Sequence, residues 1–126
     1  MAKVKRLPPR SKVKEADTWD LSSLYKSDAA WEKDFKKFQR EIKGYDKFRG
    51  QLDKSAKTLA ECLTFDLAVD RLGERLGYYC FLKTTEDQAN GTYQEMMGRY
   101  QSVASQAGEA ASFIRPELLA ISDAKL

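Results

Sequence analysis

Acidic side chains recur at a regular spacing in the middle of the chain. Asp66, Asp70 and Glu74 are four residues apart, so on a helix they would line up along one face. Such a row could in principle hold a divalent cation through oxygen ligands. Arg71 and Arg75 form a neighbouring stripe, and the three-residue step from Arg71 to Glu74 favours a surface ion pair. We therefore interpret the row as a solvated, charged helix face and predict no metal site there.

Histidine, the side chain used most often for general acid–base catalysis, is absent from all 126 residues. Its absence excludes a Ser-His-Asp triad, a Cys-His pair and the His-Glu-x-x-His zinc motif from this chain. The adjacent acids Glu86 and Asp87 do not replace it, because consecutive side chains point apart and loop carboxylates usually only aid solubility. We predict no catalytic residue and no metal ligand in this sequence.

The two cysteines, Cys62 and Cys80, lie inside apolar stretches. No cysteine-rich spacing and no secretory leader accompany them, so we interpret both as reduced, buried thiols. The apolar runs are short and the first fourteen residues are basic, so neither a membrane span nor a Sec signal is visible. We therefore expect a cytoplasmic protein that contacts no membrane.

The net charge of +3 is unevenly distributed. Six basic residues precede the first acidic residue, Glu15, so the rest of the chain carries a net charge of −3. They are Lys3, Lys5, Arg6, Arg10, Lys12 and Lys14. A basic tail could touch nucleic acid or anionic lipid, but no aromatic side chain interleaves these residues. We predict that residues 1–17 form a flexible leader, broken by Pro8 and Pro9, and that the protein binds no nucleic acid.

From residue 18 onward the pattern indicates a single helical domain over residues 18–126. The segment TWDLSSLY at 18–25 is too apolar for a free linker, so we expect it to dock on that domain. A helix capped by Ser27 or Asp28 should follow, since apolar side chains then recur every three or four residues. Those side chains are Trp31, Phe35, Phe38, Ile42 and Tyr45.

A second helix is predicted to begin at Ser55 or Thr58, with Glu61 closing a capping box on Thr58. The phase of its apolar positions drifts near residues 65–67, so we expect a bend or a short break there. The pattern then continues to about residue 83. The inward positions are Leu59, Cys62, Leu63, Leu67, Val69, Leu72, Leu76, Tyr79 and Leu82.

A polar segment, TTEDQANG at 84–91, predicts a loop, and Thr92 with Glu95 could cap the long helix that follows. Pro116 should end or kink that helix near Ile114, and it suits the first turn of one more helix. The inner face of the long helix comprises Tyr93, Met96, Met97, Tyr100, Val103, Ala104, Ala107, Ala110 and Ala111. No strand-like alternation is visible, so we predict an all-α fold: an antiparallel helical hairpin with the earlier helices packed on it.

Small residues mark two places where helices could approach closely. Gly73 and Gly77 form a GxxxG spacing in a helix that is too charged for a membrane. Small residues also replace bulky ones on the last long helix, at Gly98, Ala104, Ala107, Gly108, Ala110, Ala111 and Ser112. We expect either a tight helix pair or contact with further polypeptide, and we favour the second because the chain stops at Leu126 just after a new helix begins. The domain would then be incomplete at its C-terminal end.

Four stretches resemble the N-terminal region of the oligoendopeptidase F group, which are M3-family zinc metallopeptidases. They are DTWDLSSLY at 17–25, AWEKDF at 30–35, YYCFLKTTEDQANGTYQ at 78–94 and ASFIRPELLAI at 111–121. Their order and spacing match that group over nearly all of the chain. The resemblance implies an almost wholly helical fold. It also implies that the leader is anchored by Trp19, Asp20, Leu21, Ser22, Leu24 and Tyr25, and that the final turn is shaped by Phe113, Pro116, Glu117 and Leu118.

The resemblance further implies a cytoplasmic endopeptidase that cleaves short peptides in a deep channel. In that family a zinc ion is held by the histidines of His-Glu-x-x-His and a downstream glutamate, and none of these positions exists here. We therefore hypothesise a scaffold and channel wall that binds no cofactor and is inactive alone. Its partners would be the remainder of the peptidase polypeptide and, for the full enzyme, short peptides. An apolar face over residues 96–114 could also self-associate. The alternative is a stand-alone helical adaptor that binds a protein through the small-residue face.

Overall fold

The computed structural model describes residues 3–126, and within that range the chain forms helices and turns but no β-strand. The α-helices are α1 (Asp28–Glu41), α2 (Ala56–Glu86), α3 (Gly91–Ala111) and α4 (Ile114–Ala120). Short 3-10 turns occur at η1 (Arg10–Lys12), η2 (Glu15–Asp17), η3 (Leu21–Ser23), η4 (Ile42–Lys47) and η5 (Asp123–Lys125). The predicted all-α fold is confirmed.

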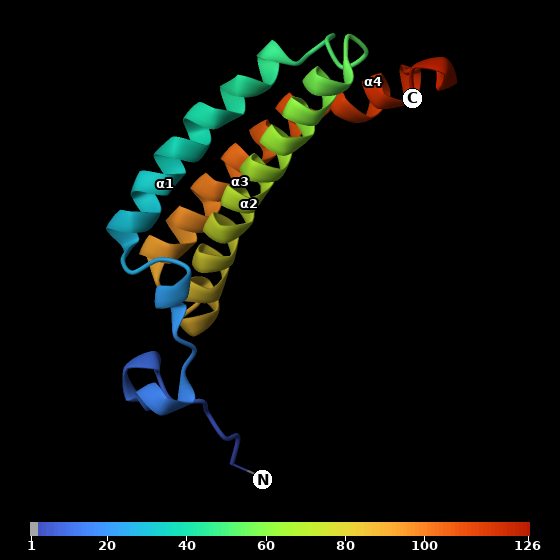
Figure 1. The fold of residues 1–126 in the computed structure, drawn as a ribbon. Helices are drawn as coiled ribbons and strands as arrows, with labels where there is room; N and C mark the ends of the chain where they lie inside the picture. The colour runs from blue at the N-terminus through green and yellow to red at the C-terminus, as the bar shows by residue number, and fades with distance from the viewer. Residues whose placement is uncertain (1–2) are drawn as a thin grey trace.

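The long helices α2 and α3 form an antiparallel hairpin, and α1 with η4 packs along it (Figure 1). The three elements follow a common arc. The N-terminal turns extend from one end of the arc, and α4 lies at the other end (Figure 1). The predicted hairpin with an earlier helix packed on it is therefore confirmed.

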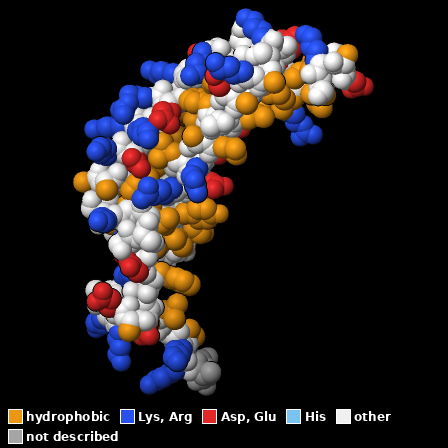
Figure 2. All heavy atoms as spheres, viewed as in Figure 1, with side chains coloured by type: hydrophobic (Ala, Val, Ile, Leu, Met, Phe, Trp, Pro, Cys, Tyr) orange, Lys and Arg blue, Asp and Glu red, His pale blue; other side chains and the backbone are white. Residues whose placement is uncertain are grey.

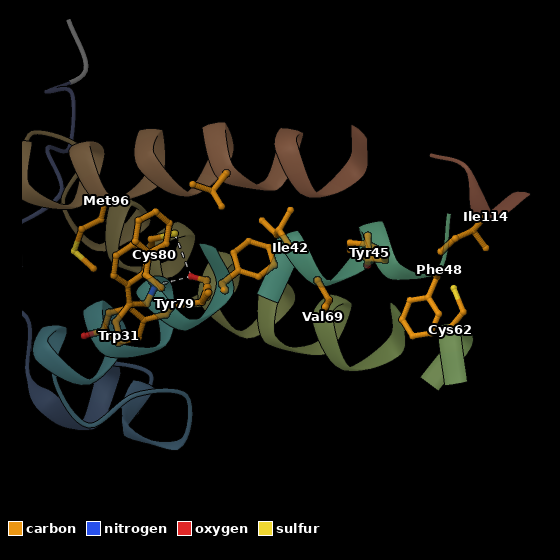
Figure 3. Close-up of a cluster of buried hydrophobic side chains, with 14 of the residues drawn as sticks. Trp31, Ile42, Tyr45, Phe48, Cys62, Val69, Tyr79, Cys80, Met96 and Ile114 are labelled. Carbon is orange, nitrogen blue, oxygen red and sulfur yellow. Dashed lines mark hydrogen bonds between the residues drawn. The ribbon is translucent and has the colours of Figure 1, made fainter. Parts of the chain in front are cut away.

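Helix α1 forms where the apolar spacing predicts it. The Ser27 side chain accepts a hydrogen bond from the Ala30 amide at 3.1 Å, which makes Ser27 the N-cap. All five predicted stripe residues are buried, and η4 continues the stripe beyond the end of α1. Trp31 stacks on Phe35 with ring centroids 4.9 Å apart, and its indole N–H donates to the Leu76 carbonyl at 2.9 Å (Figure 3). The stripe thus fixes α1 against α2.

Helix α2 runs without a break from Ala56 to Glu86, so the short break considered near residues 65–67 does not occur. Its N-cap is Ser55, which accepts from the Thr58 amide, and Glu61 closes no capping box because it lies beside Lys57 instead. The inward stripe passes through Phe65, which packs against Tyr45 and Phe48. Two leucines that were predicted to face inward instead point outward: Leu67 is 69% exposed and Leu63 is 37% exposed. The apparent drift in phase came from counting these two leucines as core.

The loop between α2 and α3 is shorter than the predicted segment 84–91. The hydroxyls of Thr84 and Thr85 donate to carbonyls one turn back, so the helix continues through Glu86. Asn90 caps α3 by accepting from the Thr92 amide at 3.0 Å. The predicted Thr92–Glu95 capping box therefore does not form, because Asn90 holds the N-cap position two residues earlier.

Both cysteines are free and buried, as predicted. Burial raises the pKa of the Cys80 thiol to about 11, and it also raises the pKa of Cys62. Further along the core, Val69, Met96 and Ile114 fill the spaces between helices (Figure 3). No helix within residues 3–126 combines the length and the apolarity needed to cross a bilayer.

The segment at 18–25 docks on the helices only through its second half. Tyr25 is buried and donates to Asp34 at 3.0 Å, and Leu21 and Leu24 are half-buried. Trp19 is 86% exposed, so the expectation that it anchors the leader is wrong. Within the leader, Arg10 reaches back to Glu86 at 3.1 Å. The flexibility of residues 1–17 stays a prediction.

Candidate functional site

Two glycines of α2 allow its neighbours to approach closely. A Cβ added at Gly73 would lie 3.1 Å from Cζ of Phe38 in α1. A Cβ added at Gly77 would lie 2.6 Å from Cζ of Tyr100 in α3. The GxxxG spacing therefore serves close helix approach on two sides of α2, as predicted from the sequence.

A single carboxylate, Asp28, joins the start of α1 to both helices of the hairpin. The Tyr79 hydroxyl donates to Asp28 Oδ1 at 2.6 Å, and the Tyr93 hydroxyl donates to Oδ2 at 3.1 Å. Burial raises the pKa of both tyrosines, and the bonds to Asp28 raise them further. Both phenols therefore stay protonated and act as donors at neutral pH.

A second link between α1 and α3 is the pair of Glu32 and Arg99. The guanidinium donates two hydrogen bonds to the carboxylate, at 2.5 and 2.8 Å, and lies 4.9 Å from the centroid of the Phe35 ring. These hydrogen bonds lower the pKa of Glu32. Such bidentate pairs fix orientation as well as distance, so this pair sets how α3 lies on α1.

The acidic row of α2 does not form a metal site. Asp66 accepts from the Tyr45 hydroxyl at 2.6 Å, and no set of three or more candidate metal ligands gathers anywhere in residues 3–126. Burial, followed by the charges of Asp66 and Glu74, raises the pKa of Asp70. The predicted pair of Arg71 with Glu74 does not form, and no ion pair within residues 3–126 involves Asp70 or Glu74.

Two adjoining hollows run between α2 and α3, and we call them together the α2–α3 groove. Their volumes are about 200 and 270 Å³, and they share Glu74 and Tyr100. Helix α2 contributes Asp70, Gly73, Glu74, Gly77, Tyr78 and Phe81, and α3 contributes Met97, Tyr100, Ala104, Ala107, Gly108 and Ala111. The hollow of about 200 Å³ is also lined by Phe38, Tyr45 and Val69. Apolar and small side chains therefore dominate the lining.

The sequence suggested that the small residues of α3 all face inward, but only some of them do. Four alanines are half-buried against the other helices, at positions 104, 107, 110 and 111. Gly98, Gly108 and Ser112 are exposed, because the rotation of 100° per residue carries them to the outer side of the helix. The small-residue face is thus divided between an internal helix contact and the surface beside the groove.

The final turn is held as the resemblance implies. Phe113 is buried, with its ring 6.4 Å from that of Tyr45. The Glu117 carboxylate accepts from the amides of Gly50 at 2.8 Å and Leu52 at 3.4 Å. Pro116 sits in the first turn of α4, as predicted. These contacts fix α4 against the turn that follows η4.

The residues that sequence reasoning missed bond across long stretches of chain. Asp28 was considered only as a possible cap, yet its partners lie 51 and 65 residues away. Glu32 and Arg99 are 67 residues apart. Local spacing carries no signal for such pairs. For the groove, the small residues of α3 were the clue in the sequence, because Ala104, Ala107, Gly108 and Ala111 line one of its hollows.

No protein-family model matches the chain. It is 38% identical to oligopeptidase PepF of Bacillus subtilis over 125 residues, which cover 98% of this chain and 18% of that protein. It is 29% identical to the chromosomal oligoendopeptidase F of Lactococcus lactis subsp. cremoris, over 87% of this chain and 18% of that protein. The solved structure of oligoendopeptidase-F from Enterococcus faecium matches with a TM-score of 0.73 and 32% identity, covering 79% of this chain and 20% of that one.

The chain thus spans about one fifth of the length of these relatives. The match is strong in sequence and in fold, and it lies at the N-terminal end of the longer proteins. The resemblance identified from the four sequence stretches is therefore confirmed: this chain is similar to the N-terminal region of oligoendopeptidase F.

Proposed function

We propose that this chain is the N-terminal helical scaffold and channel-wall part of a zinc-dependent oligoendopeptidase that hydrolyses short peptides, and that it is not catalytic by itself. The observation that carries the proposal is the match of 98% of this chain to only 18% of oligopeptidase PepF, at 38% identity. The remaining four fifths of such a protein would supply the reaction centre and would be the chain's principal partner.

The residues of this chain do not fit a zinc site. It has no histidine, its two thiols are each buried in separate parts of the core, and no set of three candidate ligands gathers in residues 3–126. Zinc would be bound by residues outside this region, where it would activate water for attack on the peptide bond. The contribution of this chain would be to position and enclose.

The fold suits a wall because its long helices are held rigidly. Helix α2 has 31 residues and so extends about 46 Å, enough to line a channel along its length. Asp28 and the Glu32–Arg99 pair connect the three long helices at one end, and Glu117 connects α4 to the turn after η4 at the other. Such a body can keep its shape while substrates enter and products leave.

We further propose that the protein is cytoplasmic, because two free, buried thiols suit a reducing environment. A peptidase that acts on short peptides there would also need a body that excludes folded proteins. A wall of packed helices could provide that exclusion.

Two measurements test the proposal. The purified chain, incubated with zinc and a fluorogenic oligopeptide, should show no turnover. A chimera of Bacillus subtilis oligopeptidase PepF, in which this chain replaces the matching segment, should hydrolyse the same peptide, whereas deletion of the segment should abolish activity. Turnover by the isolated chain that is lost on mutating its own residues would overturn the claim of inactivity. A folded but inactive chimera would count against the scaffold role.

A further inference from the structure

The α2–α3 groove exposes large apolar side chains where a solvated helix pair would carry charges. Tyr78 is 58% exposed and Phe81 is 49% exposed, and both line the hollow of about 270 Å³. Apolar side chains gather along the inner side of the arc (Figure 2). Aromatic enrichment of this kind marks the centres of protein interfaces.

The outer side of α3 continues the groove with uncharged residues. Its exposed positions at a helical spacing are Gln94, Gly98, Gln101, Ser105, Gly108 and Ser112. The outer side of α1 and η4, in contrast, is densely basic (Figure 2). Its exposed basic residues are Lys33, Lys36, Lys37 and Arg40 in α1 and Lys43 in η4. A chain in which 33% of residues are charged therefore keeps one long stripe of α3 free of charged side chains. Depletion of charge is the compositional sign of a covered surface.

The shape of the groove suits a helix. Ala104, Ala107, Gly108 and Ala111 line one hollow, and nothing lies within 4 Å of a Cβ built on Gly108. Side chains this small let the backbone of another helix come close, in the manner of ridges entering grooves. The two hollows together follow α2 from Asp70 to Phe81, about three turns of helix.

The charge of the groove defines the chemistry of the occupant. Asp70 and Glu74 lie at its edge four residues apart, without an ion-pair partner in the part of the chain that the structure describes. Burial, followed by the charges of Asp66 and Glu74, raises the pKa of Asp70, so a cation brought beside it would relieve an existing cost. The basic residues nearest in sequence on α2 are Arg71 and Arg75. Both line the neighbouring hollow on the side of η3, which Glu74 and Tyr78 also border, but neither forms an ion pair with Asp70 or Glu74 within residues 3–126.

We propose that the α2–α3 groove docks an amphipathic helix from the remainder of the peptidase polypeptide, with one or two Lys or Arg side chains of that helix paired to Asp70 and Glu74. This inference rests on the proposed function, because it takes the occupant from the four fifths of the longer relatives that this chain does not cover. It assigns the face to an internal contact of the enzyme, and it leaves the basic face of α1 towards solvent.

A defined peptide tests the chemistry on the isolated chain. The probe is an 18-residue helical peptide of Ala and Leu with two Lys four residues apart, compared with the same peptide carrying Glu at both positions. In an NMR titration the Lys peptide should shift signals of Met97, Tyr100 and Phe81, and the double variant D70K/E74K should weaken its binding about tenfold. The matched control is E109K, an exposed glutamate of α3 outside the groove, which should change the affinity by less than about twofold. Equal binding of the Glu peptide would overturn the proposal.

The chimera described above tests the identity of the occupant. D70K/E74K should lower the Tm of the active chimera without lowering the Tm of the isolated chain, and E109K should do neither. An active chimera whose Tm is unaffected by D70K/E74K overturns the docking proposal and leaves the proposed function intact. An inactive, folded chimera counts against the proposed function, while the peptide titration still decides the chemistry of the groove. Dimerisation of the isolated chain that D70K/E74K abolishes would assign the groove to a second copy and also overturn the proposal.

Discussion

Replacing Gly77 by alanine adds one methyl group at the closest approach of α2 and α3. That carbon would lie 2.6 Å from Cζ, 2.7 Å from the hydroxyl oxygen and 2.8 Å from Cε1 of Tyr100. Carbon atoms in contact prefer about 3.5–4.0 Å, so the ring must move by about 1 Å and lose packing in the groove. Overpacking of this kind costs about 1–3 kcal/mol, while alanine gains about 1 kcal/mol over glycine inside a helix. We expect Gly77→Ala to lower the free energy of unfolding by up to about 2 kcal/mol.

The matched control is Gly98→Ala in α3, where nothing lies within 4 Å of the new methyl group. Only the helix-propensity gain acts there, so this variant should be about 1 kcal/mol more stable than the natural chain. Gly73→Ala should fall between the two, because its nearest neighbour, Cζ of Phe38, lies at 3.1 Å. Urea unfolding followed by circular dichroism measures all three free energies. If Gly77→Ala is as stabilising as Gly98→Ala, the close contact with Tyr100 does not exist in solution and the reasoning is refuted.

Two substitutions and one thiol-labelling measurement test the polar contacts and the core. Asp28→Asn leaves one oxygen to accept from two phenols, so it should lower the free energy of unfolding by about 1–3 kcal/mol. Tyr79→Phe should then lower the free energy of unfolding less in the Asp28→Asn variant than in the natural chain. A double-mutant cycle measured by urea unfolding checks this difference. Asp70→Asn should raise the Tm at pH 7, because a carboxyl whose pKa is raised by folding destabilises the folded state as pH rises through that pKa. The gain should vanish below the ordinary value of 3.8, where both forms are neutral, and thermal melts across pH follow it. Cys80, buried and with a pKa of about 11, should react with a thiol reagent at pH 8 only as fast as the chain opens, and mass spectrometry measures this rate.

Sequence patterns predicted well those features that a single turn of helix determines. The cap at Ser27 and the stripe from Trp31 to Tyr45 depend on neighbours three or four residues apart, and all of them are confirmed. The continuity of α2 was missed because Leu63 and Leu67 look like core residues by type. Only the position of Phe65 against Tyr45 and Phe48 reveals that the helix buries a neighbouring stripe instead. Hydrophobic type alone does not decide burial, since many apolar side chains stay on the surface of a folded protein.

The contacts that orient the helices could not be predicted, because each joins residues that are distant in the sequence. Asp28 has the same side chain as many solvated aspartates, and its role depends on where Tyr79 and Tyr93 arrive after folding. The sequence predicted the groove only in part. The small residues of α3 indicated a close contact, but the division between an internal face and an outer face required the actual rotation of the helix.

Buried and exposed polar groups of this chain differ in how fully they are paired, and the difference supports the proposed docking face. Within residues 3–126 no buried side-chain nitrogen or oxygen lacks a hydrogen-bond partner, as is usual inside a folded protein. The surface is less even, because Tyr78 and Phe81 are about half exposed and no ion pair within residues 3–126 involves Asp70 or Glu74. Exposed aromatic area next to unpaired carboxylates is a cost that another polypeptide can relieve by packing and by charge at once.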